Sequence, residues 1–230
     1  MPRGRSASYD DQRTLILERA AALFAKHGYP STSMNQVAQA CELSKATLYH
    51  YYRDKYSLLV SIADGHVSRL AALVDDEATL ALGSEARLRH LIHRIVEEYA
   101  GAQDAHRVLT EDVRFLEPED RERVLGKERR VVTGFADAVA QVRPGAPSAP
   151  LAKPLTMLLF GMVNWMFTWM KPDGALSHAA MGPIVADLFL GGIGQVALPQ
   201  AAAPHAPQRV PDAQGAAPAE EPAGSAAAGR

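Results

Sequence analysis

The chain has 230 residues, of which 47% are hydrophobic and 22% charged. This composition is close to that of an average globular protein, and it argues against a collagen-like, wholly disordered or disulfide-stapled chain. A single cysteine, Cys41, excludes an intramolecular disulfide and a cysteine-based zinc site. We therefore expect a protein of the cell interior, and place it in the cytoplasm.

Charge is distributed unevenly along the chain, although the formal net charge is only -2. Residues 1–60 carry eight Lys/Arg against five Asp/Glu, a net charge of +3, which leaves -5 for the remainder. A basic head on an acidic body is typical of a phosphate-binding module joined to another kind of domain. A difference of this size also arises by chance, so the charge pattern needs support from motifs.

The N-terminal part of the chain has the pattern of three short helices. Apolar residues from Ile16 to Phe24 recur at i, i+4, i+7 and i+8, which predicts a helix over about 10–27. Ser33 can cap a second helix, and Ser44 a third over about 45–51. A tight turn between the second and third helices is typical of a helix-turn-helix DNA reader.

The remainder of the chain also has helical periodicity. Asp54 can cap a fourth helix, long enough to leave the head and enter the body. Alternating apolar and polar residues, the sign of a strand, are absent from the sequence. We therefore predict an all-α fold of about nine helices. The later helices are expected at about 55–74, 84–100, 104–116, 118–142, 151–170 and 177–196.

Three domains follow from this pattern. We predict a DNA-binding head over 1–56, a ligand-binding and dimerisation domain over 57–197 and an Ala/Pro-rich tail over 198–230. The tail lacks large apolar residues after Val210, so we expect it to be disordered. The most hydrophobic run, 155–170, is shorter than the roughly 20 residues of a bilayer span. We expect neither a signal peptide nor a membrane partner.

The segment from Ser33 to Leu59, with Leu-Ser-Lys-Ala-Thr-Leu-Tyr-His-Tyr-Tyr at 43–52, resembles the DNA-binding domain of the TetR family of bacterial transcriptional repressors. The resemblance covers about 10–60. Departures are small, among them Tyr52 where phenylalanine is usual and a Cys-Glu-Leu turn where glycine and valine are common. The resemblance implies a homodimer that binds a palindromic, double-stranded operator and responds to a small-molecule effector.

Helical geometry and this resemblance together indicate the DNA-binding residues. At about 100° per residue, Lys45, Tyr49 and His50 share one face of the third helix, with Leu48 on the other. The Tyr49 hydroxyl and the Lys55 ammonium suit phosphate contacts, although such surface residues are often merely solvated. The resemblance adds contacts from the ends of the two helices. The predicted set is Ser33, Asn35, Ser44, Lys45, Ala46, Thr47, Tyr49, His50 and Lys55.

A stretch over 158–170 contains both tryptophans, two phenylalanines and three methionines. Trp165 and Trp169 are four residues apart, so one continuous helix would place them on the same face. Aromatic and methionine-rich walls are typical of apolar ligand pockets, but plain core or a dimer interface is the alternative. The predicted ligand-binding residues are Phe115, Met162, Asn164, Trp165, Met166 and Trp169.

The phrase Phe-Gly-Met-Val-Asn-Trp at 160–165, followed by Trp169 and Lys-Pro-Asp-Gly at 171–174, resembles TetR-type regulators that sense acyl-coenzyme A thioesters. That resemblance implies an acyl-coenzyme A effector. Its phosphates would need cations such as Arg107, Arg114 or Arg121.

Two other classes of function have less support. His90, His93 and Glu97 have a spacing that can hold a metal, but neighbouring charges favour a solvated face, so we predict no metal and no cofactor. Catalytic motifs are absent from the sequence, so we predict no enzyme. The alternative function is a small-molecule-binding helical protein without sequence-specific DNA binding.

Overall fold

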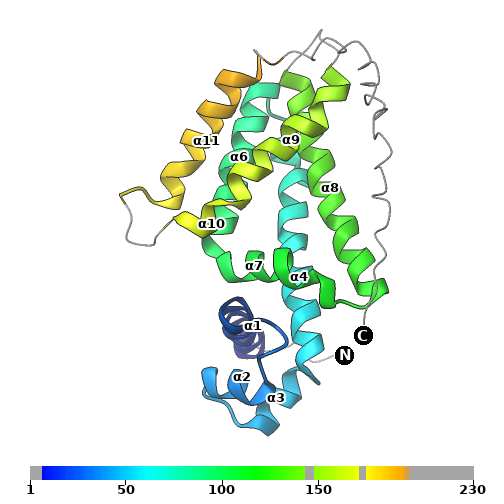
Figure 1. Cartoon of the computed structure of the whole chain (residues 1–230), viewed down its shortest axis with the longest axis vertical. Helices are drawn as coiled ribbons and strands as arrows, with labels where there is room; N and C mark the ends of the chain where they lie inside the picture. The colour runs from blue at the N-terminus through cyan, green and yellow to red at the C-terminus, as the bar shows by residue number, and fades with distance from the viewer. Residues whose placement is uncertain (1–6, 143–147, 171–174, 195, 197–230) are drawn as a thin grey trace, which may run out of the picture. The chain divides into compact units, whose positions relative to one another are not determined.

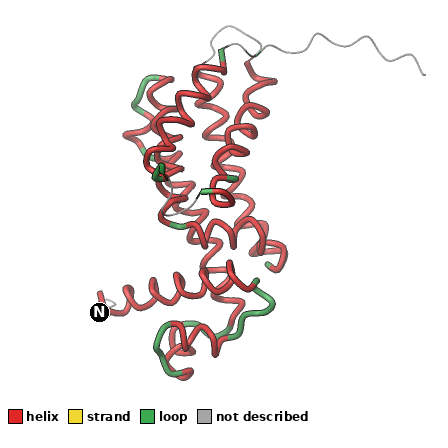
Figure 2. The backbone as a smooth tube through the Cα atoms, turned by 60° about the vertical axis from the view of Figure 1, so that its left-hand side comes forward, coloured by secondary structure: helices red, strands yellow, loops and turns green. Residues whose placement is uncertain are grey.

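Helices account for all the regular structure that the computed structural model describes, which covers residues 7–142, 148–170, 175–194 and 196. These ranges contain no strand, which confirms the all-α prediction (Figure 2). Nine of the helices have seven or more residues. The shorter elements are α5 (Glu77–Leu80), α10 (Met166–Trp169) and the 3-10 turn η1 (Val113–Phe115). The predicted tail at 198–230 and the 171–174 phrase lie outside the described residues.

The N-terminal head consists of α1 (Ala7–His27), α2 (Met34–Ala40) and α3 (Lys45–Tyr51). Local chemistry fixes their ends. The positive φ of Gly28, 82°, closes α1, and the Gly28 N–H donates to the Phe24 carbonyl at 2.7 Å. In the turn between α2 and α3 the left-handed position is occupied by Glu42, with φ 56°. This backbone conformation suits glycine, which explains why glycine is common in this turn in the family that the sequence resembles.

The helix α4 (Lys55–Asp75) begins in the head and continues into the body (Figure 1). Asp54 caps it, accepting the Ser57 N–H at 2.7 Å. By length and composition α4 is apolar enough to cross a membrane, but half of its most apolar stretch is buried inside the protein. Its apolar residues pack against α6, α7 and α8, which is the environment of a core helix.

The body consists of helices that pack around the second half of α4 (Figure 1). Several polar links and one close approach join α4 to α8. Lys127 donates to Asp64 at 2.7 Å and Arg130 pairs with Asp75 at 3.0 Å. A Cβ added at Gly134 would lie 2.6 Å from the Val74 Cβ, so the backbone of α8 meets α4 without room for a side chain. The body helices of ten or more residues are α6 (Ser84–Gly101), α7 (Gln103–Asp112), α8 (Pro118–Val142), α9 (Ser148–Asn164) and α11 (His178–Ile193).

Two predicted helices are interrupted. The helix expected over 104–116 ends at Asp112 and continues as η1. The helix expected over 151–170 breaks at Trp165, where the Thr168 N–H and hydroxyl both donate to the Trp165 carbonyl, at 3.1 and 2.7 Å. The prediction that Trp165 and Trp169 share one face of a continuous helix is therefore wrong. Met166 is buried in the core, while both tryptophans are exposed.

Candidate DNA-binding surface and effector cavities

The exposed sides of α2 and α3 carry most of the residues predicted to contact DNA. Leu48 is fully buried and anchors α3, while Tyr49 next to it is exposed. Lys55, in the first turn of α4, is half-buried. The exposed members of the predicted set are Ser33, Asn35, Ser44, Lys45, Ala46, Thr47, Tyr49 and His50.

Two serines of this set hold the helix ends in place. Ser33 accepts the Gln36 N–H at 3.3 Å, and the Gln36 side chain accepts the Ser33 N–H at 2.8 Å. Ser44 accepts the Thr47 N–H at 3.0 Å, and its hydroxyl lies 2.7 Å from that of Thr47. These caps fix the first turns of α2 and α3, which would face the DNA backbone in a helix-turn-helix complex.

Lys55 has a structural role that sequence reasoning missed. Its ammonium donates to the carbonyls of Tyr29 and Pro30, at 2.8 and 3.1 Å, and lies 4.5 Å from the centre of the Tyr29 ring. Burial lowers the pKa of this ammonium. An ammonium has three hydrogens, so two carbonyls leave one for a phosphate. The predicted phosphate contact of Lys55 stays a prediction, and the side chain also ties α4 to the loop after α1.

The head and body are joined at the N-terminal ends of α4 and α8. The Tyr56 hydroxyl donates to Asp120 at 2.7 Å and accepts the Glu117 N–H at 3.0 Å. This bond lowers the pKa of the Asp120 carboxyl. Phe115, predicted to bind a ligand, instead packs 5.5 Å from Tyr29 ring to ring. Phe115 lines neither of the cavities described below, and lies where the head meets the body.

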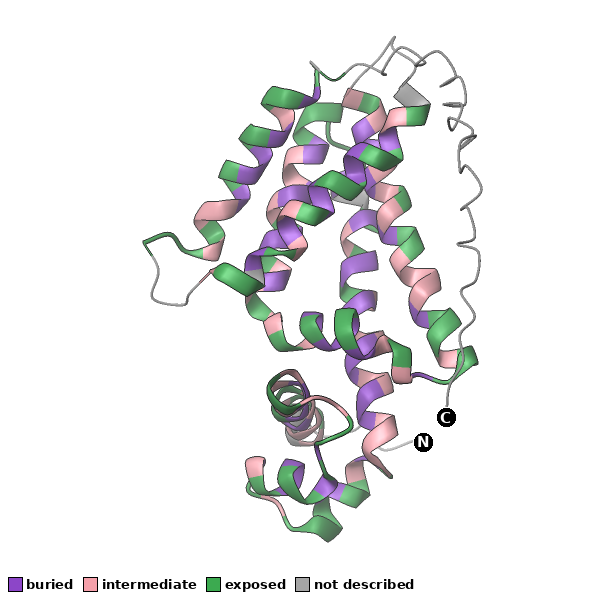
Figure 3. Ribbon diagram, in the orientation of Figure 1, coloured by how far each residue is buried: buried purple, intermediate pink, exposed green. Residues whose placement is uncertain are grey.

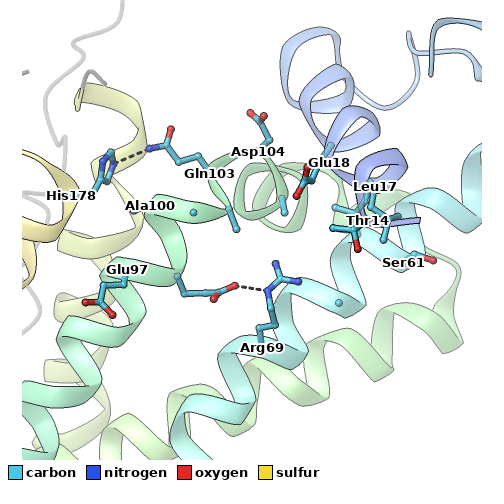
Figure 4. Close-up of a pocket in the computed structure, with 17 residues that line it drawn as sticks. Thr14, Leu17, Glu18, Ser61, Arg69, Glu97, Ala100, Gln103, Asp104 and His178 are labelled. Atoms are coloured by element: carbon cyan, nitrogen blue, oxygen red, sulfur yellow. Dashed lines mark hydrogen bonds and ion pairs between the residues drawn. The ribbon is translucent and has the colours of Figure 1, made fainter. Parts of the chain in front are cut away.

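A cleft of about 840 Å³ lies between α1, α4, α6 and α7 (Figure 4). Acidic side chains line it from three helices: Glu18 of α1, Glu97 and Glu98 of α6, and Asp104 of α7. Arg69 of α4 is paired with Glu98 at 2.5 Å. We call this space the head–body cleft.

A second, much smaller cavity of about 10 Å³ lies inside the body. Gln103 and His178 line both this interior cavity and the head–body cleft, and their side-chain nitrogens form a hydrogen bond of 2.9 Å (Figure 4). An interior space of this size is at the limit for one water molecule. A ligand can enter it only if side chains move. The other lining residues are Tyr99, His106, Val163 and Met166.

Two histidines are buried beside the interior cavity. His66 Nε2 lies 3.3 Å from His106 Nδ1, and the His106 ring stacks on Tyr99 with centroids 3.9 Å apart. Burial lowers the pKa of His66 to about 3 and that of His106 to about 4. Both rings are therefore neutral at pH 7. In a neutral imidazole one nitrogen donates and the other accepts, so one of the two facing nitrogens can donate a hydrogen bond to the other.

The structure separates the residues predicted to bind a ligand. Met166 alone among them lines the interior cavity. Asn164 ends α9, and its Oδ1 is buried without a hydrogen bond from a described residue. Met162 packs at the edge of the core. Trp165 and Trp169 are 66% and 54% exposed and line neither cavity.

Sequence reasoning missed Gln103, His178, Tyr99 and His106. These residues come from three helices and belong to no motif. His106 contacts His66, which is 40 positions away in the sequence, so no local pattern indicates their contact. Only the packing of α6, α7 and α11 brings these four residues to the cavities.

Comparisons with known proteins agree with this architecture. Residues 16–62 match the description "Bacterial regulatory proteins, tetR family", and residues 81–193 match "Tetracyclin repressor-like, C-terminal domain". The crystal structure of a TetR-family transcriptional regulator from Bordetella parapertussis is 35% identical and covers 80% of this chain and 97% of its own, with a TM-score of 0.72. This chain belongs to the TetR family. It is a transcriptional repressor with a helix-turn-helix DNA-binding domain.

Two further relatives of this TetR-family protein have informative names. The HTH-type transcriptional repressor KstR2 of Rhodococcus jostii is 22% identical over 197 residues, covering 84% of this chain and 96% of that protein. The crystal structure of AibR in complex with isovaleryl coenzyme A and operator DNA is 25% identical. It covers 78% of this chain and 96% of its own, with a TM-score of 0.63.

Proposed function

We propose that this TetR-family repressor acts in the cytoplasm as a homodimer that binds a palindromic operator and leaves it when a small effector occupies the body. The observation that carries the proposal is the exposed surface of α2 and α3. Eight of the nine residues predicted from the sequence to contact DNA are exposed there, around the fully buried Leu48. This arrangement can place polar side chains at base edges while the head keeps its own core.

The homodimer is supported by large apolar side chains that are exposed on α9, α10 and α11. Figure 3 shows exposed residues on each of these helices. Leu158 and Leu188 are each 65% exposed, which is costly for side chains left in water. Trp165 and Trp169 belong to the same surface, so the packing alternative for this stretch now has more support than the pocket. The surface comprises Met157, Leu158, Trp165, Trp169, Ile184 and Leu188, and we call it the apolar surface.

We propose an acyl-coenzyme A as the effector. Support comes from the sequence phrase at 160–165 and from AibR, whose structure contains isovaleryl coenzyme A. The acyl part would lie in a widened interior cavity beside Met166, with Asn164 available to accept a hydrogen bond. Phosphates would bind arginines on α7, η1 and α8. Arg121 is exposed, whereas Arg107 is already paired with Glu111 at 3.0 Å and Arg114 lies over Phe115.

Selection of bound sequences from random duplex DNA with the full chain tests the repressor function. An inverted repeat should emerge, with half-sites about 34 to 36 Å apart or a multiple of that spacing. Affinity for the selected DNA should fall steeply as salt rises, because Lys/Arg contacts release counterions. Enrichment of no sequence at any salt concentration would instead favour the alternative, a small-molecule-binding protein without sequence-specific DNA binding.

A panel of acyl-coenzyme A thioesters, added to the complex with the selected DNA, tests the effector. We expect at least one member to release the DNA. If none of the thioesters released the DNA, acyl-coenzyme A would be excluded as the effector, but the proposed repressor function would stand.

A further inference from the structure

The head–body cleft adjoins the interior cavity proposed for the acyl group, since Gln103 and His178 line both, but its chemistry is different. We propose that it binds a small organic cation with an apolar body, such as an aromatic or alkyl amine. Its volume, about 840 Å³, lies within the range of small-molecule sites. One wall belongs to the DNA-binding head and the others to the body, so a bound molecule contacts both domains (Figure 4).

Apolar side chains make up part of the cleft lining, which we call its floor. They are Leu17 and Ala21 of α1, Ile62 of α4 and Ala105 of α7. Gly65 lies in the middle of α4, where glycine costs about 1 kcal/mol relative to alanine. A Cβ at Gly65 would meet only the Arg69 guanidinium, at 3.9 Å. The glycine therefore leaves open space at the cleft wall, and the apolar floor suits an aromatic ring or alkyl chain better than a hydrated inorganic cation.

The charge of the cleft determines the charge of its ligand. Four carboxylates line it, and Arg69 neutralises only one of them, Glu98. Glu97 has a long contact with Arg94 at 3.6 Å, outside the cleft lining. Within the described part of the chain, no ion pair is present for Glu18 or Asp104. With four carboxylates and one guanidinium, the cleft carries an excess of negative charge, which attracts cations and repels anions such as coenzyme A phosphates.

Binding of two naphthalene compounds of opposite charge tests this proposal with the full chain and without DNA. 1-Naphthylmethylamine is a cation at pH 7 and 1-naphthaleneacetate an anion, and both are fluorescent, so anisotropy measures their binding. We expect the amine to bind at least about tenfold more tightly than the acetate. Equal affinity, or no amine binding at about 1 mM, would overturn the proposal.

Variants assign the binding to the cleft. Glu18→Gln with Asp104→Asn should weaken amine binding about tenfold, while Asp11→Asn with Glu85→Gln, acidic residues of α1 and α6 outside the cleft, should leave it unchanged. Gly65→Leu should abolish binding by filling the open space, with circular dichroism and thermal unfolding as checks of the fold. Amine binding that is the same in the wild type and the Glu18/Asp104 variant would contradict the site. Since no DNA is used, this result is independent of the repressor function.

Discussion

Tyr49 carries its hydroxyl on the exposed side of α3, while Leu48 beside it is fully buried. Lys45 lies near the same ring, with its ammonium 5.9 Å from the centroid. A phenol in this position can donate to a phosphate without reading any base, because phosphates are the same in all sequences. Asn35 and Thr47 differ from Tyr49, since amide and hydroxyl groups can bond base edges.

Tyr49→Phe should therefore weaken binding to the selected operator and to random DNA alike, by about 1 kcal/mol or roughly fivefold, through loss of one hydrogen bond. Fluorescence anisotropy on both DNAs measures this. Asn35→Ala should change which operator is preferred instead. If Tyr49→Phe left both affinities unchanged, the orientation of α3 on DNA would be wrong.

The left-handed backbone of Glu42 lowers the stability of the folded chain, because this conformation costs a non-glycine residue about 1–2 kcal/mol. Glu42→Gly should raise the free energy of unfolding by about 0.5–1 kcal/mol, because the greater freedom of glycine in the unfolded chain offsets part of the relief. Urea denaturation measures the change. Gly28→Ala, at φ 82°, is the matched control and should destabilise the protein. If Glu42→Gly lowered the free energy of unfolding, the conclusion that the backbone of Glu42 is strained would be wrong.

The buried histidines predict a pH dependence of stability. Their folded pKa values, about 3 for His66 and about 4 for His106, lie below the usual value near 6.5, so the unfolded chain binds more protons between these limits. Their stabilisation is present above pH 6.5 and is lost as the pH falls toward 4. Near pH 5 the loss should approach about 1.4 kcal/mol per pH unit for each histidine. Urea denaturation at several pH values measures the slope, and His66→Leu with His106→Leu should reduce it.

At the scale of elements, α4 and α8 behave as one unit because polar bonds and a close backbone approach join them along their length. Lys127 bonds both Asp64 and Ser68, and Gly134 sits against Val74. The N-terminus of α8 also holds Tyr56 of α4 through Asp120. A displacement of α8 by a ligand in the body would therefore move α4, and with it the head.

Gly134→Ala should destabilise the protein by about 1–3 kcal/mol, because the new Cβ would lie 2.6 Å from the Val74 Cβ and the two helices would have to separate. Gly126→Ala is a matched control in the same helix, since its Cβ would meet only the Arg129 guanidinium at 3.7 Å. The control should be neutral or stabilising by up to about 1 kcal/mol through helix propensity. Thermal and urea unfolding compare them, and equal effects would show that α4 and α8 are not in close contact.

At the scale of the whole molecule, the apolar surface on α9, α10 and α11 predicts the oligomeric state. Leu158→Glu with Leu188→Glu should convert the dimer into a monomer, because the interface would have to bury unpaired carboxylates. Light scattering after gel filtration measures the mass. Leu82→Glu introduces the same charge at an exposed leucine outside this surface, and should leave the dimer intact. A wild-type monomer at micromolar concentration would contradict the homodimer.

Much of the fold was predictable because its signals are local. Ser33, Ser44 and Asp54 cap the helices at which their positions in the sequence place them, and the apolar stripe with Leu48 inward predicts which face of α3 is exposed. Such features depend on bonds within four residues and on a 3.6-residue period. The sequence by itself therefore determined the all-α class, the three head helices and the exposed side of α3.

The tertiary structure alone decided the roles that depend on distant segments. The Lys55 ammonium bonds carbonyls 25 and 26 positions away, and Phe115 packs against Tyr29. Both tryptophans lie on the surface, and residues of five helices come together to line the acidic head–body cleft. Periodicity shows which face of a helix is apolar, but not which partner covers it. The physical reason is that burial depends on packing between elements, and no local spacing encodes that packing.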